Sequence, residues 1–190
     1  MTTAVKSSPW GKPRAKAWMS SHNCSQMRCA RLCRAAARES DRRPSSPNSV
    51  VCELKSTLAA CTYDASSGVL APMQIVSTVS PDFKGRSAAA EVIVAPSGQF
   101  LYTATRWADV LTVYSIDQLT GQVTSIDWIS AGVRTPREFA MDPTGSYVYA
   151  MGLDSDTINT FAVDAASGKL TPTGQLVNAN SPVCMVFGKV

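Results

Sequence analysis

The stretch Ala90–Thr124, AEVIVAPSGQFLYTATRWADVLTVYSIDQLTGQVT, decides the fold because it recurs 47 residues later without a gap. The second copy is Arg137–Thr171, REFAMDPTGSYVYAMGLDSDTINTFAVDAASGKLT. Repeats with a period of roughly 20–50 residues are typical of solenoids, propellers and related arrays. Eight columns of the match are identical: Glu91/Glu138, Pro96/Pro143, Gly98/Gly145, Tyr102/Tyr149, Asp109/Asp156, Asp117/Asp164, Gly121/Gly168 and Thr124/Thr171.

The pattern within one copy predicts four short strands joined by turns. In the second copy, Glu138–Met141 and Tyr147–Met151 flank a turn at 142–145 that has proline and glycine where a tight turn favours them. Thr157–Val163 alternates between two faces, and Lys169 opens a fourth strand. Four strands in about 47 residues match one blade of a β-propeller. We therefore predict an all-β fold, a partial β-propeller of about three four-stranded blades.

The repeat begins part-way through a unit, which divides the chain into a tail of residues 1–48 and a partial propeller over residues 49–190. Asp64 and Gly68 align with Asp117 and Gly121, and this alignment predicts strands over 49–53, 58–63 and 70–76 without an innermost first strand. Two complete blades are predicted over roughly 88–131 and 136–178. Residues 183–187 are predicted to form the innermost strand of a further blade. A ring fragment of this kind has open sheet edges, which favour self-association.

The charge distribution is uneven along the chain. Ten of the 18 Lys and Arg residues precede Pro44, and the remainder of the chain has 8 basic against 12 acidic residues. The blades therefore lack the basic patch that a nucleic-acid partner requires. No run of about 18 apolar residues is present, so we expect no membrane partner. The tail composition predicts low order, with a helix over 26–38, an organelle presequence or coding material unrelated to the propeller as alternatives.

The six cysteines follow no disulfide framework, which favours a reducing compartment. We expect the cytoplasm, with organelle import through the basic tail as the alternative. His22 precedes Cys24, Cys29 and Cys33, but the spacing of these residues differs from that of a zinc site. We therefore expect no metal and no cofactor.

Three charged residues are predicted to share one rim of the propeller. Successive strands of a blade alternate in direction. The turns that follow the first and the third strand of each blade therefore lie on one rim. The end of the second strand and the start of the first strand lie on the other rim. This second rim holds Glu53, Arg106 and Arg137, and Glu53 and Arg106 occupy the same repeat position. An acid beside two arginines suits hydrolysis of an anionic ester or lactone, with Glu53 acting on water and the arginines holding the anion. A structural ion pair of Glu53 with Arg106 is the alternative.

Other polar and aromatic residues have simpler interpretations. Asp109 and Asp156 recur in both copies, as expected of residues that build the blade. Asp117 and Asp164 occur in turns, where an aspartate bonds its own backbone. Trp107 follows Arg106 and could line a site, although an aromatic residue between strands more often serves packing.

The same residues carry a resemblance to a known family. The motifs CELKST at 52–57, AAEVIVAPSGQFLY at 89–102, TPREFAMDPTG at 135–145 and SPVC at 181–184 resemble the C-terminal part of the seven-bladed propeller lactonases. That family includes the propeller-type 6-phosphogluconolactonases and the fungal carboxy-muconate cyclase. The resemblance spans about Ser49 to Phe187 and implies that Glu53, Arg106 and Arg137 are active-site residues acting on a small anionic lactone.

The sequence also departs from the family pattern. Cys52 stands where the family usually has asparagine, Gly152-Leu153 stands where it often has Asn-Gln, and its His-Pro motif is absent. We predict a lactonase of carbohydrate metabolism, acting on a sugar-acid lactone such as 6-phosphogluconolactone and weakened by the missing blades. The alternatives are a non-catalytic propeller fragment or binding module, and a muconate-type lactone cyclase. A metal-dependent gluconolactonase propeller is disfavoured because it would need several inward carboxylates.

Overall fold

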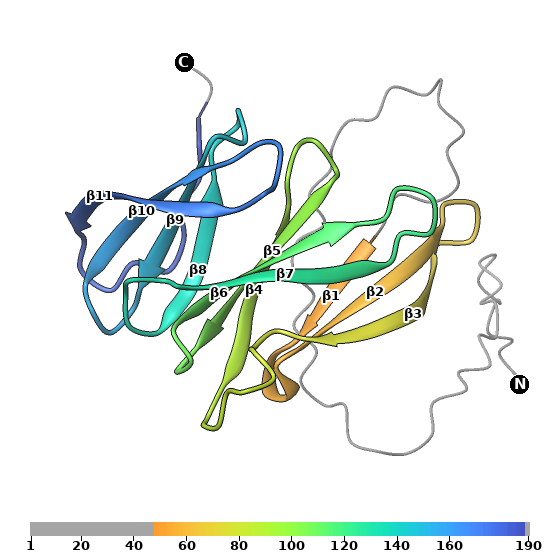
Figure 1. The fold of residues 1–190 in the computed structure, drawn as a ribbon, viewed down its shortest axis with the longest axis horizontal. Helices are drawn as coiled ribbons and strands as arrows, with labels where there is room; N and C mark the ends of the chain where they lie inside the picture. Colours follow the sequence, from red (N-terminus) through yellow and green to blue (C-terminus); the bar gives the residue numbers. More distant parts are fainter. Residues whose placement is uncertain (1–47, 189–190) are drawn as a thin grey trace, which may run out of the picture.

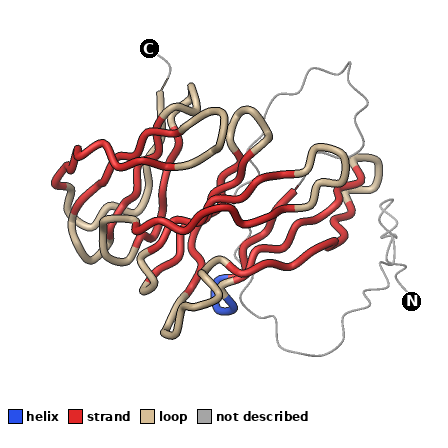
Figure 2. The backbone as a smooth tube through the Cα atoms, in the orientation of Figure 1, coloured by secondary structure: helices blue, strands red, loops and turns tan. Residues whose placement is uncertain are grey.

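The computed structural model describes residues 48–188, which form three antiparallel sheets side by side (Figure 1). In each sheet the strands pair in chain order, as in the blades of a propeller. Almost all regular structure in this part is strand, apart from the 3-10 helix η1, Glu53–Lys55 (Figure 2). The all-β, partial-propeller prediction is thus confirmed. Blade 1 contains β1 (Asn48–Cys52), β2 (Thr57–Asp64) and β3 (Val69–Ser77); blade 2 contains β4 (Ala88–Val94), β5 (Phe100–Arg106), β6 (Val110–Ile116) and β7 (Val123–Ser130); blade 3 contains β8 (Pro136–Met141), β9 (Tyr147–Gly152), β10 (Thr157–Val163) and β11 (Leu170–Asn178).

Blade 2 is packed on both faces by its neighbours, and every residue of β5 is therefore buried. One apolar cluster fills the interface with blade 1, where Gln74 also bonds the backbone of Val123 at 2.8 and 2.9 Å. A second cluster fills the interface with blade 3, where the Tyr102 hydroxyl donates to the Gly168 carbonyl at 2.9 Å. The largest fully buried side chains include Tyr102, Tyr114, Phe139, Phe161, Leu58, Leu101 and Leu111.

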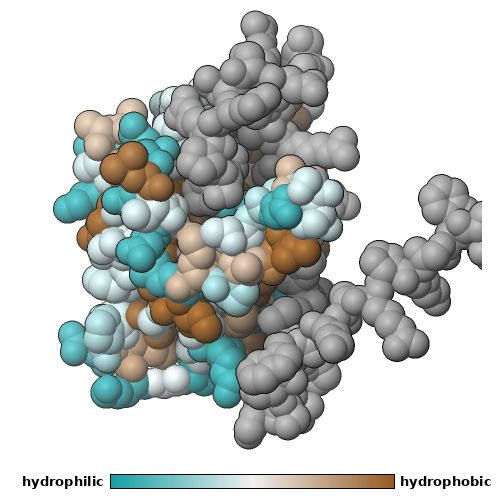
Figure 3. All heavy atoms as spheres, turned by 90° about the vertical axis from the view of Figure 1, so that its right-hand side faces the viewer, coloured by the Kyte–Doolittle hydropathy of each residue, from teal (hydrophilic) through white to brown (hydrophobic). Residues whose placement is uncertain are grey.

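The outer side of blade 1 is less completely covered. Figure 3 views the molecule from this side, where brown, hydrophobic residues lie among teal, hydrophilic ones. The exposed apolar side chains of β3 are those of Val69, Leu70, Met73 and Ile75. At the inner edge of the same blade, β1 has no further strand paired with it within residues 48–188, and self-association through that edge stays a prediction.

One rim of the molecule, which we call the turn rim, carries the same turn in all three blades. The Gly68, Gly121 and Gly168 amides donate to the carbonyls of Asp64, Asp117 and Asp164 at 2.7–2.8 Å, and these glycines have φ between 70° and 74°. Each aspartate carboxylate also accepts from a backbone amide two residues ahead at 2.9 Å. Hydrogen bonds of this kind lower the pKa of each aspartate, that of Asp64 to about 2 mainly through Ser66. The predicted turn role of Asp117 and Asp164 matches this geometry.

The opposite rim, the loop rim, is formed by the longer connections from β3 to β4 and from β7 to β8. Here Ser56, Asp109 and Asp156 occupy equivalent positions with φ of 47°, 51° and 53°. Their carbonyls accept from the backbone just past the fourth strand at 2.8–2.9 Å. The Asp109 carboxylate also accepts from the Thr135 amide at 2.8 Å, and so fixes the entry into blade 3. Asp109 thus has the framework role that its recurrence predicts.

Two local predictions were wrong. Residues 183–187 form no strand, because within the described residues no second strand is present with which they could pair; Phe187 instead packs against Tyr149 with ring centroids 5.6 Å apart. Glu53 begins η1 rather than ending β1. The tail predictions, including low order, the helix over 26–38 and the His22–Cys33 metal alternative, lie outside the described residues. Within the described part, no helix has the length and apolar character needed to cross a membrane.

Candidate active site

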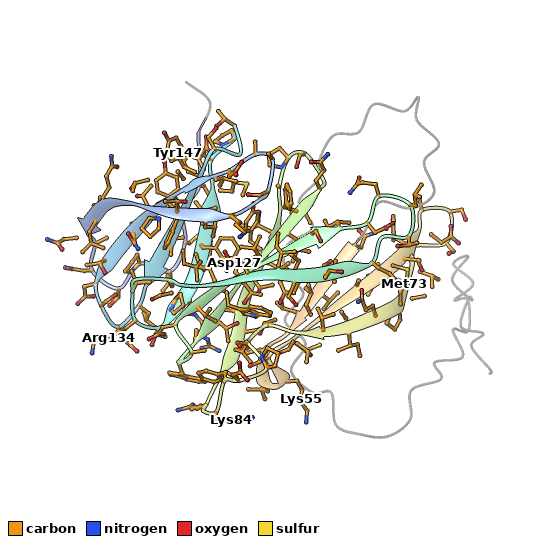
Figure 4. All side chains as sticks on the ribbon, viewed as in Figure 1. Lys55, Met73, Lys84, Asp127, Arg134 and Tyr147 are labelled. Carbon is orange, nitrogen blue, oxygen red and sulfur yellow. The ribbon has the colours of Figure 1, made fainter. Side chains whose placement is uncertain are left out.

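The loop rim gathers nearly all the basic side chains of the described region. Of the seven lysines and arginines in residues 48–188, only Lys169 belongs to the turn rim. Figure 4 shows Lys55, Lys84 and Arg134 on the lower side of the molecule, opposite Tyr147 on the upper side. The turn rim instead carries four aspartates, at positions 64, 117, 142 and 164, so the loop rim is the less acidic of the two rims and the better suited to an anionic ligand.

Glu53 and Arg106 form an ion pair across the interface of blades 1 and 2. Arg106 is the last residue of β5, opposite Ala88 of β4, and its side chain is only 10% exposed. Glu53 opens η1 with a side chain that is 26% exposed, and the left-handed Ser56 ends this turn by donating its amide to the Glu53 carbonyl. The pair is thus buried on the arginine side and accessible on the carboxylate side.

The pair leaves hydrogen-bonding capacity unused. Arg106 donates through its terminal Nη2 to Oε1 of Glu53, while Oε2 of Glu53 has no partner among residues 48–188. Nε of Arg106 is buried and also without a partner in this part of the chain. Buried polar groups in native proteins are nearly always paired, so an unpaired donor of this kind needs an explanation, and a catalytic role or a bound water is one.

Trp107 lies between two guanidinium groups beside this pair. Its φ of 64° is unusual for a bulky residue and marks the turn that follows β5. The Cζ atom of Arg106 lies 5.0 Å from the ring centroid, and the Cζ atom of Arg86 lies 3.4 Å from it. Cation–π attraction operates at both distances. Trp107 therefore joins the β3–β4 loop, which carries Arg86, to the Glu53–Arg106 pair.

Arg137 is on the same rim but is not part of the pair. In β8 the register shifts between Pro136 and Glu138, so that Arg137 is the extra residue of a β-bulge. β4 has the same bulge, where Ala90 occupies the equivalent position. Bulges redirect a side chain out of the regular alternation. Arg137 has no hydrogen-bond or ion-pair partner among the described residues, and its guanidinium is available to a ligand.

The innermost strands of blades 2 and 3 also carry a repeated glutamate, at Glu91 and Glu138. Burial raises the pKa of Glu91 above its ordinary value, and the charge of Glu138 raises it further, while a hydrogen bond from the Val92 amide opposes both. Within residues 48–188, no group of three or more His, Cys, Asp and Glu residues is arranged to hold a metal ion.

The structure thus brings Glu53 and Arg106 together as the sequence predicts and places Arg137 on the same rim without contact to them. Arg86 was missed, because its distance of 21 residues from Trp107 along the chain gives no sequence signal. The position equivalent to Glu53 and Arg106 in blade 3 is Leu153, so among residues 48–188 this ionic pair occurs at one blade interface.

Comparison with known proteins agrees with this architecture. The model of the family described as "Lactonase, 7-bladed beta-propeller" matches residues 49–187. The chain belongs to this family of propeller lactonases. A 6-phosphogluconolactonase of Bacillus subtilis is 29% identical over 138 residues, which cover 73% of this chain and 40% of the relative. The predicted family membership is confirmed.

Two solved structures are similar to this chain in fold. A protein from Lactobacillus plantarum has a TM-score of 0.70 and 31% identity, covering 73% of this chain and 40% of its own. The periplasmic gluconolactonase of Pseudomonas aeruginosa has a TM-score of 0.67 and 28% identity, covering 70% of this chain and 37% of its own. The chain spans less than half the length of the Bacillus subtilis relative and of each of these two solved structures.

Proposed function

We propose that the loop rim is part of the active site of a lactonase of carbohydrate metabolism that hydrolyses a sugar-acid lactone such as 6-phosphogluconolactone. The observation that carries the proposal is the ion pair of Glu53 with Arg106, which leaves Oε2 of Glu53 without a partner in the described part of the chain. Membership of the lactonase family and the name of the Bacillus subtilis relative support the choice of substrate class. The cytoplasm stays our proposed location.

The reaction adds water to the lactone carbonyl and opens the ring. Glu53 takes a proton from the water through its unpartnered oxygen while the water oxygen bonds the carbonyl carbon. The ring C–O bond then breaks, and the ring oxygen becomes a hydroxyl by receiving the proton held on Glu53. Arg106 keeps the carboxylate oriented by holding its other oxygen.

The arginines supply positive charge where negative charge develops. A tetrahedral intermediate places an oxyanion on the former carbonyl oxygen, and fixed donors in a site that excludes water stabilise such charge strongly. Arg137 is suited to this role because it lies on the bulge of an innermost strand and has no partner within the described residues.

Hydrolysis of 6-phosphogluconolactone by the full chain tests the proposal through Glu53→Gln. The amide cannot accept the proton of water, and loss of a general base costs about 100- to 10,000-fold in rate. The amide oxygen still accepts from Arg106, so we expect the free energy of unfolding to fall by only about 0.5–1.5 kcal/mol. The rate of lactone opening is measured from the acid that the reaction releases, and the free energy of unfolding is measured by urea titration.

Arg134→Gln is the matched control for this experiment. Arg134 is an exposed loop-rim residue whose side chain donates to the Asp154 carbonyl, away from the Glu53–Arg106 pair. We expect it to keep wild-type hydrolysis. A wild-type rate equal to that of buffer would refute the proposal. So would a Glu53→Gln variant that hydrolyses normally but is destabilised by about 3–5 kcal/mol, since that result describes a structural pair.

A further inference from the structure

We propose that Arg86, stacked on Trp107, is the residue that recognises a phosphoester group on the substrate and makes the site prefer phosphorylated sugar acids. This inference rests on the proposed function, since it assigns specificity within the same site. Its basis is the position, charge balance and rigidity of Arg86 relative to the Glu53–Arg106 pair.

The chain brings Arg86 to the pair from the β3–β4 loop. Ala88 pairs with Arg106 at the end of the β4–β5 ladder, so Arg86 lies just beyond that end, beside Trp107. Ser87 is bonded to Ser56, which ends the η1 turn, with 2.8 Å between their hydroxyl oxygens. Arg86 is thus fixed between the turn that carries Glu53 and the strand end that carries Arg106.

The loop that carries Arg86 is held at both of its ends. At its start, Thr78 is fully buried, and its carbonyl accepts from the hydroxyls of Thr105 at 3.1 Å and Thr112 at 2.9 Å. At its end, Ser87 makes the contact with Ser56 described above. A guanidinium on such a loop loses little further freedom on binding, and this favours affinity.

Next to the Glu53–Arg106 pair, Arg86 is the cation whose charge no acid among the described residues balances. Arg106 is neutralised by Glu53, whereas Arg86 is exposed and has no acidic partner among the described residues. Trp107 contacts the flat face of the Arg86 guanidinium, because the Cζ atom lies 3.4 Å from the ring centroid. Stacking uses the face of the group and leaves its in-plane N–H donors free.

Free, coplanar N–H donors on a fixed guanidinium match the oxygens of a phosphate ester in a bidentate geometry. A phosphate monoester carries about −1.5 to −2 charges at pH 7, more than the single charge of a carboxylate. An uncompensated arginine therefore discriminates in favour of the phosphorylated ligand. Arg106 cannot do this equally well, since its charge is shared with Glu53.

Calorimetric titration of the full chain with 6-phosphogluconate and with gluconate tests this assignment. Both acids are open-chain products, so binding is measured without turnover. For the wild type we expect tighter binding of 6-phosphogluconate. For Arg86→Met we expect a loss of about 10-fold or more in its affinity, the value of one charge-assisted hydrogen bond, with gluconate affinity unchanged. Arg86 is exposed, and a thermal melt confirms that the variant folds.

Lys84→Met is the matched control, because Lys84 is exposed in the same loop and its replacement removes the same charge. We expect it to change the affinity for 6-phosphogluconate by less than about 3-fold, the size of a screened surface charge effect. An equal loss in Lys84→Met and Arg86→Met would overturn the assignment, and so would wild-type affinity in Arg86→Met or equal wild-type affinity for the two acids. If the wild type hydrolyses no lactone but still prefers 6-phosphogluconate over gluconate through Arg86, only the proposed reaction is refuted.

Discussion

The two rims of the molecule are built from the same repeat but differ in what their residues do. On the turn rim, the aspartate and glycine of each five-residue turn are the same in all three blades and make the same hydrogen bonds. On the loop rim, one repeat position holds Glu53, Arg106 and Leu153 in successive blades. Positions that recur build the framework, whereas the position that differs between blades supplies charge at a single interface.

The loop rim contains both kinds of position side by side. Asp109, which recurs as Asp156, accepts from the Thr135 amide and fixes the entry to the next blade. Three residues earlier, Arg106 differs in every blade and pairs with Glu53. Within one turn, Asp109 therefore has a structural role and Arg106 a chemical one, and substitutions can test this difference.

The largest expected effect is at a shared position, Gly168→Ala. Gly168 has φ of 72°, and an added Cβ would collide with the ring of Phe100 at the interface of blades 2 and 3. We expect a loss of about 2–4 kcal/mol in the free energy of unfolding, from the left-handed backbone and from overpacking together. Urea titration provides the measurement.

Gly68→Ala is the control that isolates the contact. Gly68 has φ of 70°, but nothing lies within 4 Å of its added Cβ. We expect only the backbone cost, about 1–2 kcal/mol. Equal losses in the two variants would show that the turn, and not the blade interface, makes the glycine necessary at this position.

A smaller effect is expected at Glu91. This residue recurs as Glu138, but unlike the recurring turn residues it lowers the stability of the fold when it is ionised, because its carboxylate is buried. Its pKa is raised in the fold, mainly by burial. The contribution of Glu91 to stability is therefore fully present below its ordinary pKa of 4.5 and is lost as the pH rises through the raised value. Glu91→Gln stays neutral, so we expect this variant to be more stable than the wild type at pH 7.

Unfolding of Glu91→Gln and wild type from pH 4 to pH 7 checks this sign. The turn-rim aspartates are common to both proteins, and their titration cancels in the difference. The advantage of the variant should grow with pH and then level off. A constant difference would contradict the prediction, and so would a wild type that is the more stable protein at pH 7.

The sequence predicted the blades because their information is local and repeated. The period of 47 residues, the Asp-to-Gly turns and the alternation in β10 determine the strands without any long-range contact. The failure at 183–187 has the opposite cause. A propeller strand next to the channel exists only when a second strand pairs with it, and an apolar segment alone cannot supply that partner.

The candidate site was predicted in part, for a similar reason. The offset of 53 residues assigns Glu53 and Arg106 to one repeat position, which the antiparallel strands place on one rim. The bulge at Arg137 and the stacking of Arg86 on Trp107 depend on backbone geometry and on a loop without a repeat. No periodic sequence pattern predicts the bulge or the stacking.

The central claim is that ligand binding belongs to the loop rim, and amide chemical shifts of the isotopically labelled chain test it most directly. During titration with 6-phosphogluconate, we expect shifts at residues 53–56, 86–88 and 106–109, including the indole N–H of Trp107. Residues 64–68, 117–121 and 164–168 on the turn rim should stay unchanged. Shifts concentrated on the turn rim, or no shift at the loop rim with ligand in the millimolar range, would contradict the account.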